Sequence, residues 1–410
     1  MAPFADGRGR VARAVALLLG AGALLAVMAA LGRLSPLVDV GPLLRAALVL
    51  VATAALGAAA WLWRRRPDVG GREAALVIGS VALAVAMLEG GLRLRARFAD
   101  TNGNAFDRLD DTLGWTLRSG VRGRSVDGGR YHSTADGLRA RVNAGAARRV
   151  LVVGDSYTQA VQVDDDSTYW ARLSRARPDL EFVVMGVGGY GTLQELMQIE
   201  RLAPREQPDL IVWQLCGNDL VANDFELERR SLWDNNGMRR PYLEHDTLAY
   251  RDPSATAFTD RSMLARVLAG HLRVVRSEQL RQRSIEQELP DRPAELARAL
   301  ATTRALYARA ASRVGAHRVL AFSTTTAYPS EPLGTAARGE GFAYANVADS
   351  VDEARRRGAD VARSTTDAHW NARGHAIASR VLLRMLETLL PVQPPPHSES
   401  SIVTVPAHAH

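Results

Sequence analysis

The feature that most restricts the fold of this chain is an alternation of short apolar runs and helical stretches from Arg149 to Leu389. Apolar runs rich in β-branched residues predict strands, and longer periodic stretches predict helices. The predicted order is strand 149–154, helix 167–177, strand 181–185, helix 192–202, strand 209–215, helix 293–314, strand 318–322, helix 347–357, strand 360–362 and helix 372–389. Short apolar strands separated by helices are typical of a parallel sheet covered on both faces, so we predict a three-layer α/β/α domain over 149–390.

The first hundred residues have a different composition. Three apolar runs, at about 11–31, 43–63 and 74–92, each approach the ~20 residues that a helix needs to cross a membrane. They predict a transmembrane region over 1–97, followed by a linker and lead-in over 98–148. The first run also resembles a signal peptide, but two further apolar runs follow it, which favours a retained span over a cleaved one.

Arginine placement predicts the orientation of these spans. Two groups of arginines, before the first run and between the second and third, predict cytoplasmic segments: Arg8, Arg10, Arg13, Arg64, Arg65, Arg66 and Arg72. Three arginines after the third run argue for the opposite orientation. The balance predicts a multi-pass protein of the cell membrane whose C-terminal domain is extracytoplasmic.

Composition excludes some classes of function. The net charge is +7, and the chain contains arginine but no lysine. The arginines are scattered rather than gathered with aromatic residues, so we expect no nucleic-acid partner. No phosphate-binding loop or metal-type His/Cys cluster occurs, so we expect neither cofactor nor metal. Cys216, the single cysteine, lies in an apolar run and is expected to be buried and inert. Periodicity fades over 223–290, which predicts an insertion near the active site, and 391–410 reads as a disordered tail.

Polar residues follow the predicted strands where they end. Ser156 follows the first strand, a glycine-rich segment over 186–192 follows the second, and Asn218 follows the third. Asp367 and His369 precede the last helix. Because parallel sheets place their sites outside the carboxyl ends of the strands, we expect these residues to meet.

This combination of side chains suits acyl transfer. Ser156 is a weak nucleophile that needs a base, which His369 supplies, and Asp367 holds that base in one tautomer. The backbone N–H groups of Ser156 and Gly189 and the side-chain amide of Asn218 are candidate donors to an oxyanion. Alternatively, Ser156 is only a helix cap, Asn218 closes a turn and His369 is a surface residue. The four motifs in this order favour catalysis.

The motifs resemble those of the SGNH/GDSL hydrolase family over about 113–389. GDS supplies Ser156, GVGGYGT supplies Gly189, GND supplies Asn218, and DAHW supplies Asp367 and His369. The resemblance implies a flavodoxin-like SGNH hydrolase fold. Many members have Asp-x-x-His, whereas this chain has Asp-x-His, a form similar to that of the polysaccharide O-acetylation branch. The second motif is one residue longer than usual, which makes Gly188 an alternative donor to Gly189.

Three functional hypotheses follow from these residues. The first is a serine-dependent esterase, a class that includes deacetylases. It would form an acyl-enzyme on a glycan or lipid ester outside the cytoplasmic membrane. The second is an O-acyltransferase, such as an O-acetyltransferase, for an envelope or exported polysaccharide, with a multi-span protein as acyl donor. The third is a non-catalytic component of polysaccharide assembly, which the intact Ser156–His369–Asp367 set disfavours.

Overall fold

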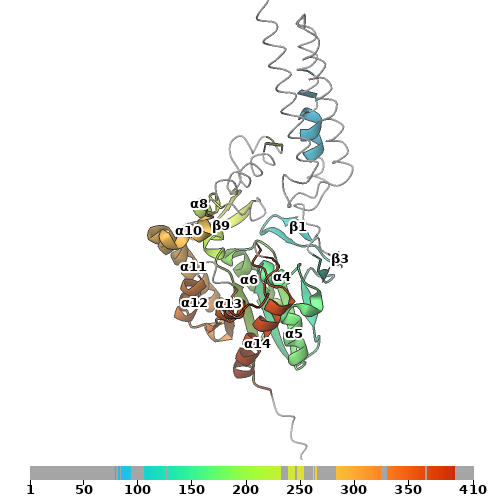
Figure 1. Cartoon of the computed structure of the whole chain (residues 1–410), viewed down its shortest axis with the longest axis vertical. Helices are drawn as coiled ribbons and strands as arrows, with labels where there is room; N and C mark the ends of the chain where they lie inside the picture. The colour runs from blue at the N-terminus through green and yellow to red at the C-terminus, as the bar shows by residue number, and fades with distance from the viewer. Residues whose placement is uncertain are drawn as a thin grey trace, which may run out of the picture.

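A six-stranded sheet forms the centre of the C-terminal domain (Figure 1). The computed structural model describes residues 79, 82–83, 85–93, 106–124, 128–231, 239–244, 247–253, 262, 264–265, 283–324, 330–364 and 367–392. The sheet contains β5 (Ala140–Val142), β6 (Arg148–Gly154), β7 (Leu180–Gly186), β8 (Leu210–Leu215), β11 (Val319–Ser323) and β12 (Ala343–Ala345). Their order across the sheet is β12-β11-β8-β6-β7-β5. Every neighbouring pair is parallel except β5 and β7, so the predicted parallel core is present with one antiparallel edge strand.

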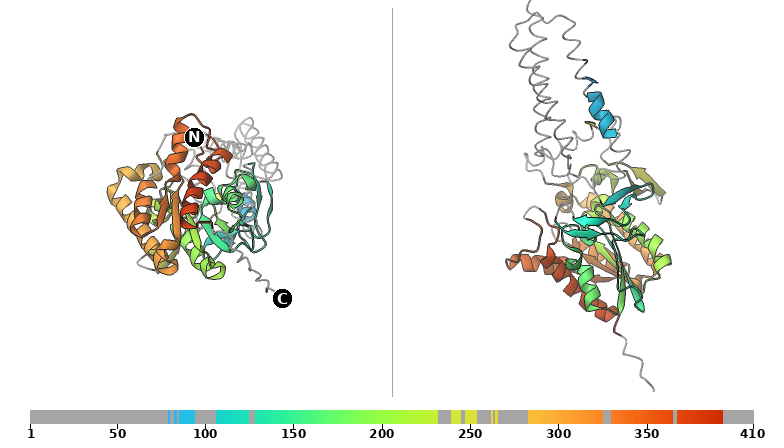
Figure 2. Two further views of the ribbon diagram at one scale, coloured as in Figure 1. Left: turned by 90° about the horizontal axis from the view of Figure 1, so that it is seen from below. Right: turned by 90° about the vertical axis from the view of Figure 1, so that its right-hand side faces the viewer.

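Helices cover both faces of this sheet, as the views in Figures 1 and 2 show. On one face lie α6 (Thr192–Glu206), α11 (Pro293–Val314) and α12 (Ser330–Gly339). On the other lie α5 (Tyr169–Ala176), α13 (Val347–Arg356) and α14 (Ala372–Leu389). Side chains of successive residues in β6 point to opposite faces of the sheet. Leu151 packs in the apolar core under α6, α11 and α12, and Val152 packs in the core under α5, α13 and α14. Both faces are therefore apolar, which is why β6, β7 and β8 read as continuous apolar runs.

The strand order places a switch point at the centre of the sheet. The chain runs from β6 outward to β7, then crosses to β8 on the other side of β6, and continues outward to β11 and β12. This is the flavodoxin-like arrangement, in which a crevice opens beyond the carboxyl ends of the strands where the order reverses. Ser156 follows β6 and Asn218 follows β8, so the predicted site residues come from the strands that flank this point.

Two hairpins precede the sheet and further elements interrupt it. The lead-in contains β1 (Asp107–Asp110), β2 (Gly114–Leu117), β3 (Arg122–Arg124) and β4 (Arg130–His132). The described part of the insertion contains α8 (Phe225–Glu228), β9 (Arg240–Glu244), β10 (Thr247–Arg251) and α10 (Ile285–Glu288). Backbone of the two regions is in contact, since a methyl group on Gly114 would lie 2.4 Å from the Arg239 carbonyl oxygen. The remaining short helices are α4 (Ser156–Gln159), α7 (Asp219–Ala222) and the 3₁₀ turns Asp165–Ser167, Leu289–Asp291 and Ala316–Arg318.

One predicted strand is wrong. Residues 360–362 do not join the sheet; Ala362 forms a single antiparallel bridge with Trp370. The fifth parallel strand is β12, only three residues long and composed of Ala343, Tyr344 and Ala345. Such a short run with two alanines has too little β-branched character to be recognised from sequence. Helix α12 before it was also not predicted.

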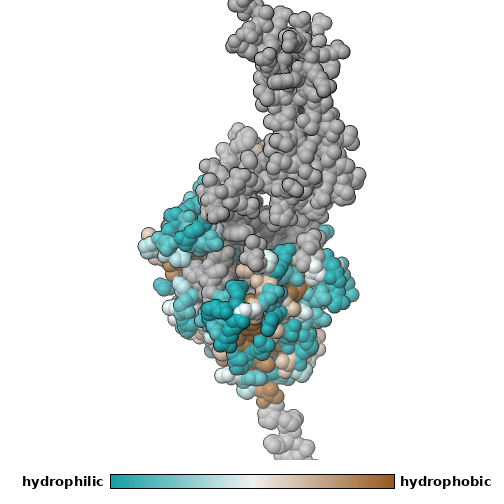
Figure 3. Space-filling view, in the orientation of Figure 1, coloured by the Kyte–Doolittle hydropathy of each residue, from teal (hydrophilic) through white to brown (hydrophobic). Residues whose placement is uncertain are grey.

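The predicted membrane spans fall mainly outside the described residues. The spans at 11–31 and 43–63 lie wholly outside them, as do most of the predicted tail and part of the insertion. Of the span at 74–92, residues 79, 82–83 and 85–92 are described and helical. Within the ranges that the structure describes, no helix combines the length and the apolar character that crossing a membrane requires. On the described surface facing the viewer in Figure 3, hydrophilic residues predominate, with smaller apolar areas between them.

Candidate active site

Ser156 lies on a sharp turn from β6 into α4. Asp155 caps this short helix, its carboxylate accepting the Tyr157 backbone N–H at 3.0 Å. Gly154 permits the turn, because a methyl group there would lie 2.4 Å from the Thr158 hydroxyl. As the first residue of a helix, Ser156 has a backbone N–H without an intrahelical acceptor, so that N–H remains available to a substrate.

His369 lies 213 residues after Ser156 in the sequence, and it meets Ser156 together with Asp367. The Nε2 atom of His369 lies 2.7 Å from the Ser156 hydroxyl oxygen. Its Nδ1 atom lies 2.6 Å from an Asp367 carboxylate oxygen. A carboxylate only accepts, so Nδ1 of the neutral ring carries the proton and Nε2 is the acceptor that faces the serine hydroxyl. The structure thus brings the three predicted residues into the order nucleophile, base and orienting acid.

Asp367 is held in its ionised form. Its second carboxylate oxygen accepts from the Arg363 guanidinium at 2.8 Å. The hydrogen bond from His369 lowers the pKa of Asp367 well below its ordinary value, with a smaller contribution from Arg363. The His369 ring is about one-third exposed, at 37%, and the Asp367 side chain is 25% exposed. The charged end of the triad therefore borders solvent rather than the core.

Tyr157 supports the His369 ring, a role that the sequence did not reveal. The two rings stack with centroids 4.9 Å apart and an interplanar angle of 30°. The Tyr157 hydroxyl donates to the Ala368 carbonyl oxygen at 3.1 Å. Buried Trp370 packs edge-on against Tyr157 at 5.0 Å. The only sequence signal for this contact is that Tyr157 follows the nucleophile, since stacking depends on a residue more than 200 positions away.

The candidate oxyanion donors lie on three adjacent strand ends. The chain on either side of each motif is buried, whereas the candidate donor residues are half-buried. These are Ser156 after β6, Gly188 and Gly189 after β7, and Asn218 after β8. These positions are therefore where the buried backbone becomes accessible. Asn218 is the N-cap residue that precedes α7, and its side-chain oxygen has no hydrogen-bond partner among the described residues.

Gly189, rather than Gly188, presents an unengaged N–H. The Gly188 N–H donates to the side-chain oxygen of Gln159 at 2.9 Å. Gly189 has φ +78°, a conformation that favours glycine, and no bond from its N–H is found within the described part of the chain. Of the two candidates, Gly189 is therefore the one whose N–H has no hydrogen-bond partner among the described residues, and its role as a donor stays a prediction.

Three other groups near the site are unsuited to catalysis. Burial raises the pKa of the Cys216 thiol well above its ordinary value, so it stays protonated. Burial lowers the pKa of His375 to about 3, and its Nδ1 accepts the Tyr169 backbone N–H at 3.3 Å. Burial also raises the pKa of Asp155, whose carboxylate caps α4. Among the described residues no group of His, Cys, Asp and Glu could hold a metal ion.

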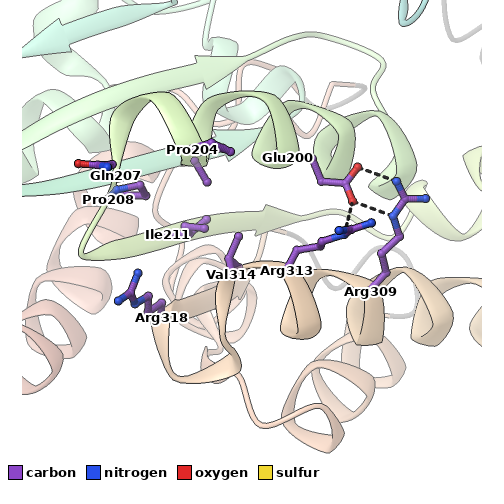
Figure 4. A pocket seen from close by; sticks show the side chains of 10 residues that line it. Glu200, Pro204, Gln207, Pro208, Ile211, Arg309, Arg313, Val314 and Arg318 are labelled. Carbon is purple, nitrogen blue, oxygen red and sulfur yellow. Dashed lines mark hydrogen bonds and ion pairs between the residues drawn. The ribbon is translucent and has the colours of Figure 1, made fainter.

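A separate groove of about 720 Å³ lies at the opposite end of the sheet, between α6 and α11 (Figure 4). Its lining includes the amino-terminal half of β8, at Ile211, whereas Ser156 follows the carboxyl end of β6. Glu200 accepts from Arg309 at 2.7 Å and lies 3.8 Å from Arg313, so charges there are largely paired. The described residues that line it include no serine, cysteine or histidine, and we assign the chemistry to the Ser156 site.

The fold and the site together define a three-layer α/β protein with a Ser–His–Asp arrangement at the switch point of a flavodoxin-like sheet. Residues 152–377, more than half of the chain, match the GDSL-like lipase/acylhydrolase family. The chain belongs to this family, and it is an SGNH/GDSL-type serine hydrolase that acts on ester bonds.

Several solved structures are similar to this chain at low identity. A member of the lipolytic G-D-S-L family from Veillonella parvula is 14% identical with a TM-score of 0.33, covering 58% of this chain and 97% of its own. A lipase/acylhydrolase from Enterococcus faecalis is 11% identical with a TM-score of 0.36, covering 60% and 100%. An acetylxylan esterase from Geobacillus stearothermophilus is 13% identical with a TM-score of 0.33, covering 59% and 95%. No curated protein matches the chain in sequence.

Proposed function

We propose that the chain is an esterase that uses Ser156 as nucleophile and forms a covalent acyl-enzyme. The observation that carries this proposal is the continuous pair of short contacts, 2.7 Å from Ser156 to His369 and 2.6 Å from His369 to Asp367. As Oγ attacks the ester carbonyl, Nε2 takes its proton. The oxyanion accepts from Ser156 N–H, Gly189 N–H and Asn218. Collapse breaks the ester bond and the leaving alcohol takes the proton from His369; water then repeats the sequence and frees the acid.

The nucleophile is tested by active-site labelling. A fluorophosphonate probe is expected to label the full chain but not Ser156→Ala, whereas Ser174→Ala, a buried serine on α5, keeps its labelling. Hydrolysis of p-nitrophenyl acetate should follow the same pattern, and His369→Ala should lose several orders of magnitude in kcat. Equal labelling of Ser156→Ala and the wild type would reject the assignment.

The proposed location is the cell membrane, with the catalytic domain outside the cytoplasm. Three apolar runs and the arginine distribution of the first hundred residues support it. The substrate would then be an acyl ester of an envelope glycan or a lipid. Alkaline phosphatase fused after residue 392 is expected to be active in cells, because this reporter folds only outside the cytoplasm. A fusion that is expressed but inactive would contradict the orientation.

An O-acyltransferase is the second candidate, and the Asp-x-His spacing, similar to that of the polysaccharide O-acetylation branch, favours it. The acyl-enzyme would be the same, with a sugar hydroxyl in place of water and a multi-span protein as donor. Acetyl transfer to oligosaccharides should then compete with release of acetate. If no tested acceptor changes the ratio of acetyl transfer to acetate release, the esterase remains the proposed function. A chain that no probe labels and that turns over no ester would favour a non-catalytic role in polysaccharide assembly.

A further inference from the structure

Trp115 connects the lead-in to the oxyanion loop, although it lies outside the residues that match the hydrolase family. Its side chain is fully buried on β2. The indole N–H donates to the Gly188 carbonyl oxygen at 2.9 Å, across 73 residues of sequence. The family chemistry assigned above does not use this contact.

The contact fixes the direction of the candidate oxyanion donor. The Gly188 carbonyl and the Gly189 N–H belong to one peptide unit, and the described residues contain no cis peptide bond. In a planar trans peptide the N–H points opposite to the carbonyl. Because the indole holds the carbonyl on one side, the Gly189 N–H is directed to the other. The peptide also borders the nucleophile, since a methyl group on Gly188 would lie 3.8 Å from Ser156 Cβ.

A second hydrogen bond to Gly188 connects this loop to the same hairpin, through Gln159 of α4. Gln159 accepts the Gly188 N–H at 2.9 Å, and its own amide donates to Asp107 at 3.0 Å. Asp107 is buried on β1 and pairs with Leu117 of β2. Both bonds to Gly188 therefore lead back to the β1–β2 hairpin.

The indole itself has little freedom to move. The Tyr190 hydroxyl donates to the Trp115 carbonyl oxygen at 2.6 Å, and the two rings pack edge-on at 5.7 Å. The Arg240 guanidinium of β9 lies 5.3 Å from the Trp115 ring. Precise placement of a donor requires that the groups which orient it are themselves fixed, and Trp115 meets this condition.

We propose that Trp115 is a positioning residue for the oxyanion hole, aiming the Gly189 N–H at the substrate through its bond to the Gly188 carbonyl. This inference rests on the acyl-transfer function proposed above. A misdirected donor weakens transition-state stabilisation more than substrate binding. Loss of the indole N–H should therefore lower kcat by about 10- to 100-fold and change KM little, less than the loss of a whole donor.

The test removes the indole N–H of Trp115 in the full chain. Trp115→Phe does so with loss of volume, and 3-benzothienylalanine at position 115 does so at nearly constant shape. Trp170→Phe is the matched control, because that buried indole donates to the Thr158 carbonyl oxygen at 3.1 Å instead of to the oxyanion loop. We expect both changes at 115 to lower kcat and the control to stay within about threefold. Wild-type kcat in the folded benzothienylalanine protein, or an equal loss in Trp170→Phe, would overturn the inference.

A second readout separates positioning from general structure. A thionoester places sulfur, a poor hydrogen-bond acceptor, where the oxyanion forms, so its penalty relative to the oxygen ester reports on the hole. That penalty should shrink at least several-fold in both Trp115 variants; an unchanged penalty would overturn the inference. Activity remaining in Ser156→Ala would instead reject the proposed function, so the two failures are distinguishable.

Discussion

Asp367 holds His369 twice with a single oxygen atom. The same carboxylate oxygen accepts the His369 ring at 2.6 Å and its backbone N–H at 3.0 Å. A short acidic side chain that accepts from the backbone two residues ahead forms a local turn, and here that turn also aligns the imidazole. The two-residue spacing therefore lets one carboxylate oxygen contact both the ring and the backbone of His369. Arg363 donates to the other carboxylate oxygen.

We expect Asp367→Asn to lower kcat by about 10³- to 10⁴-fold, because an amide donor beside Nδ1 moves the ring proton to Nε2 and removes the acceptor for the serine. Arg363→Gln is the companion variant and should cost less than about tenfold, since Arg363 is 43% exposed and exposed pairs contribute little. Initial rates on p-nitrophenyl acetate measure both. A loss below tenfold in Asp367→Asn would contradict the role of Asp367.

The contact between Tyr157 and His369 leads to a graded prediction. Tyr157→Phe keeps the stacked ring and loses one neutral hydrogen bond to Ala368, so kcat should fall about fivefold or less. Tyr157→Ala removes the stack and frees the imidazole, and a shift of about 1 Å in a catalytic group can cost roughly 100-fold. Steady-state kinetics of both variants, with circular dichroism to confirm folding, checks the order. Equal losses in the two would refute the role of the ring.

Sequence reasoning succeeded where one local pattern dictates the structure. Strand β8 is buried at every position, and Pro293 starts the long helix α11, whose predicted ends agree with those observed. Ser156 and His369, whose side chains lie 2.7 Å apart, could be predicted as site residues because a strand-end serine and a histidine before a helix carry chemical meaning in short motifs. Strand β12 could not be predicted because three residues offer no periodicity.

Residues whose roles depend on distant partners could not be predicted. Tyr157 matters because of His369, and Trp115 because of Gly188, contacts that exist only after the sheet and the lead-in hairpin have assembled. Gly189 was preferred to Gly188 by motif alone. The physical reason, that Gln159 occupies the Gly188 N–H, required the structure.

Gly189→Ala should impair activity beyond its effect on stability. At φ +78° an alanine is strained by roughly 1–2 kcal/mol, and relief of that strain would turn the donor away. We expect about 100-fold lower kcat, the cost of one oxyanion donor. Gly358→Ala is the control, because Gly358 has φ +84°, is exposed and has open space around it. It should lose comparable stability and keep kcat; full activity in Gly189→Ala would exclude this donor.

His375 should make the folded chain sensitive to mild acid. Its pKa falls from 6.5 to about 3 on folding, chiefly through burial, with repulsion from Arg172 adding to it. The unfolded chain therefore binds a proton below pH 6.5 that the folded chain refuses, so stability is complete above pH 6.5 and declines as the pH falls toward 3. At about 1.4 kcal/mol per pH unit, the cost by pH 5 is about 2 kcal/mol.

The neutral variant His375→Asn starts from lower stability but lacks this slope. Urea unfolding at pH 7 and pH 5 should show the wild-type advantage shrinking by that amount, while other titrating groups cancel between the two proteins. Parallel pH dependence of both proteins would show that His375 is not buried in its neutral form.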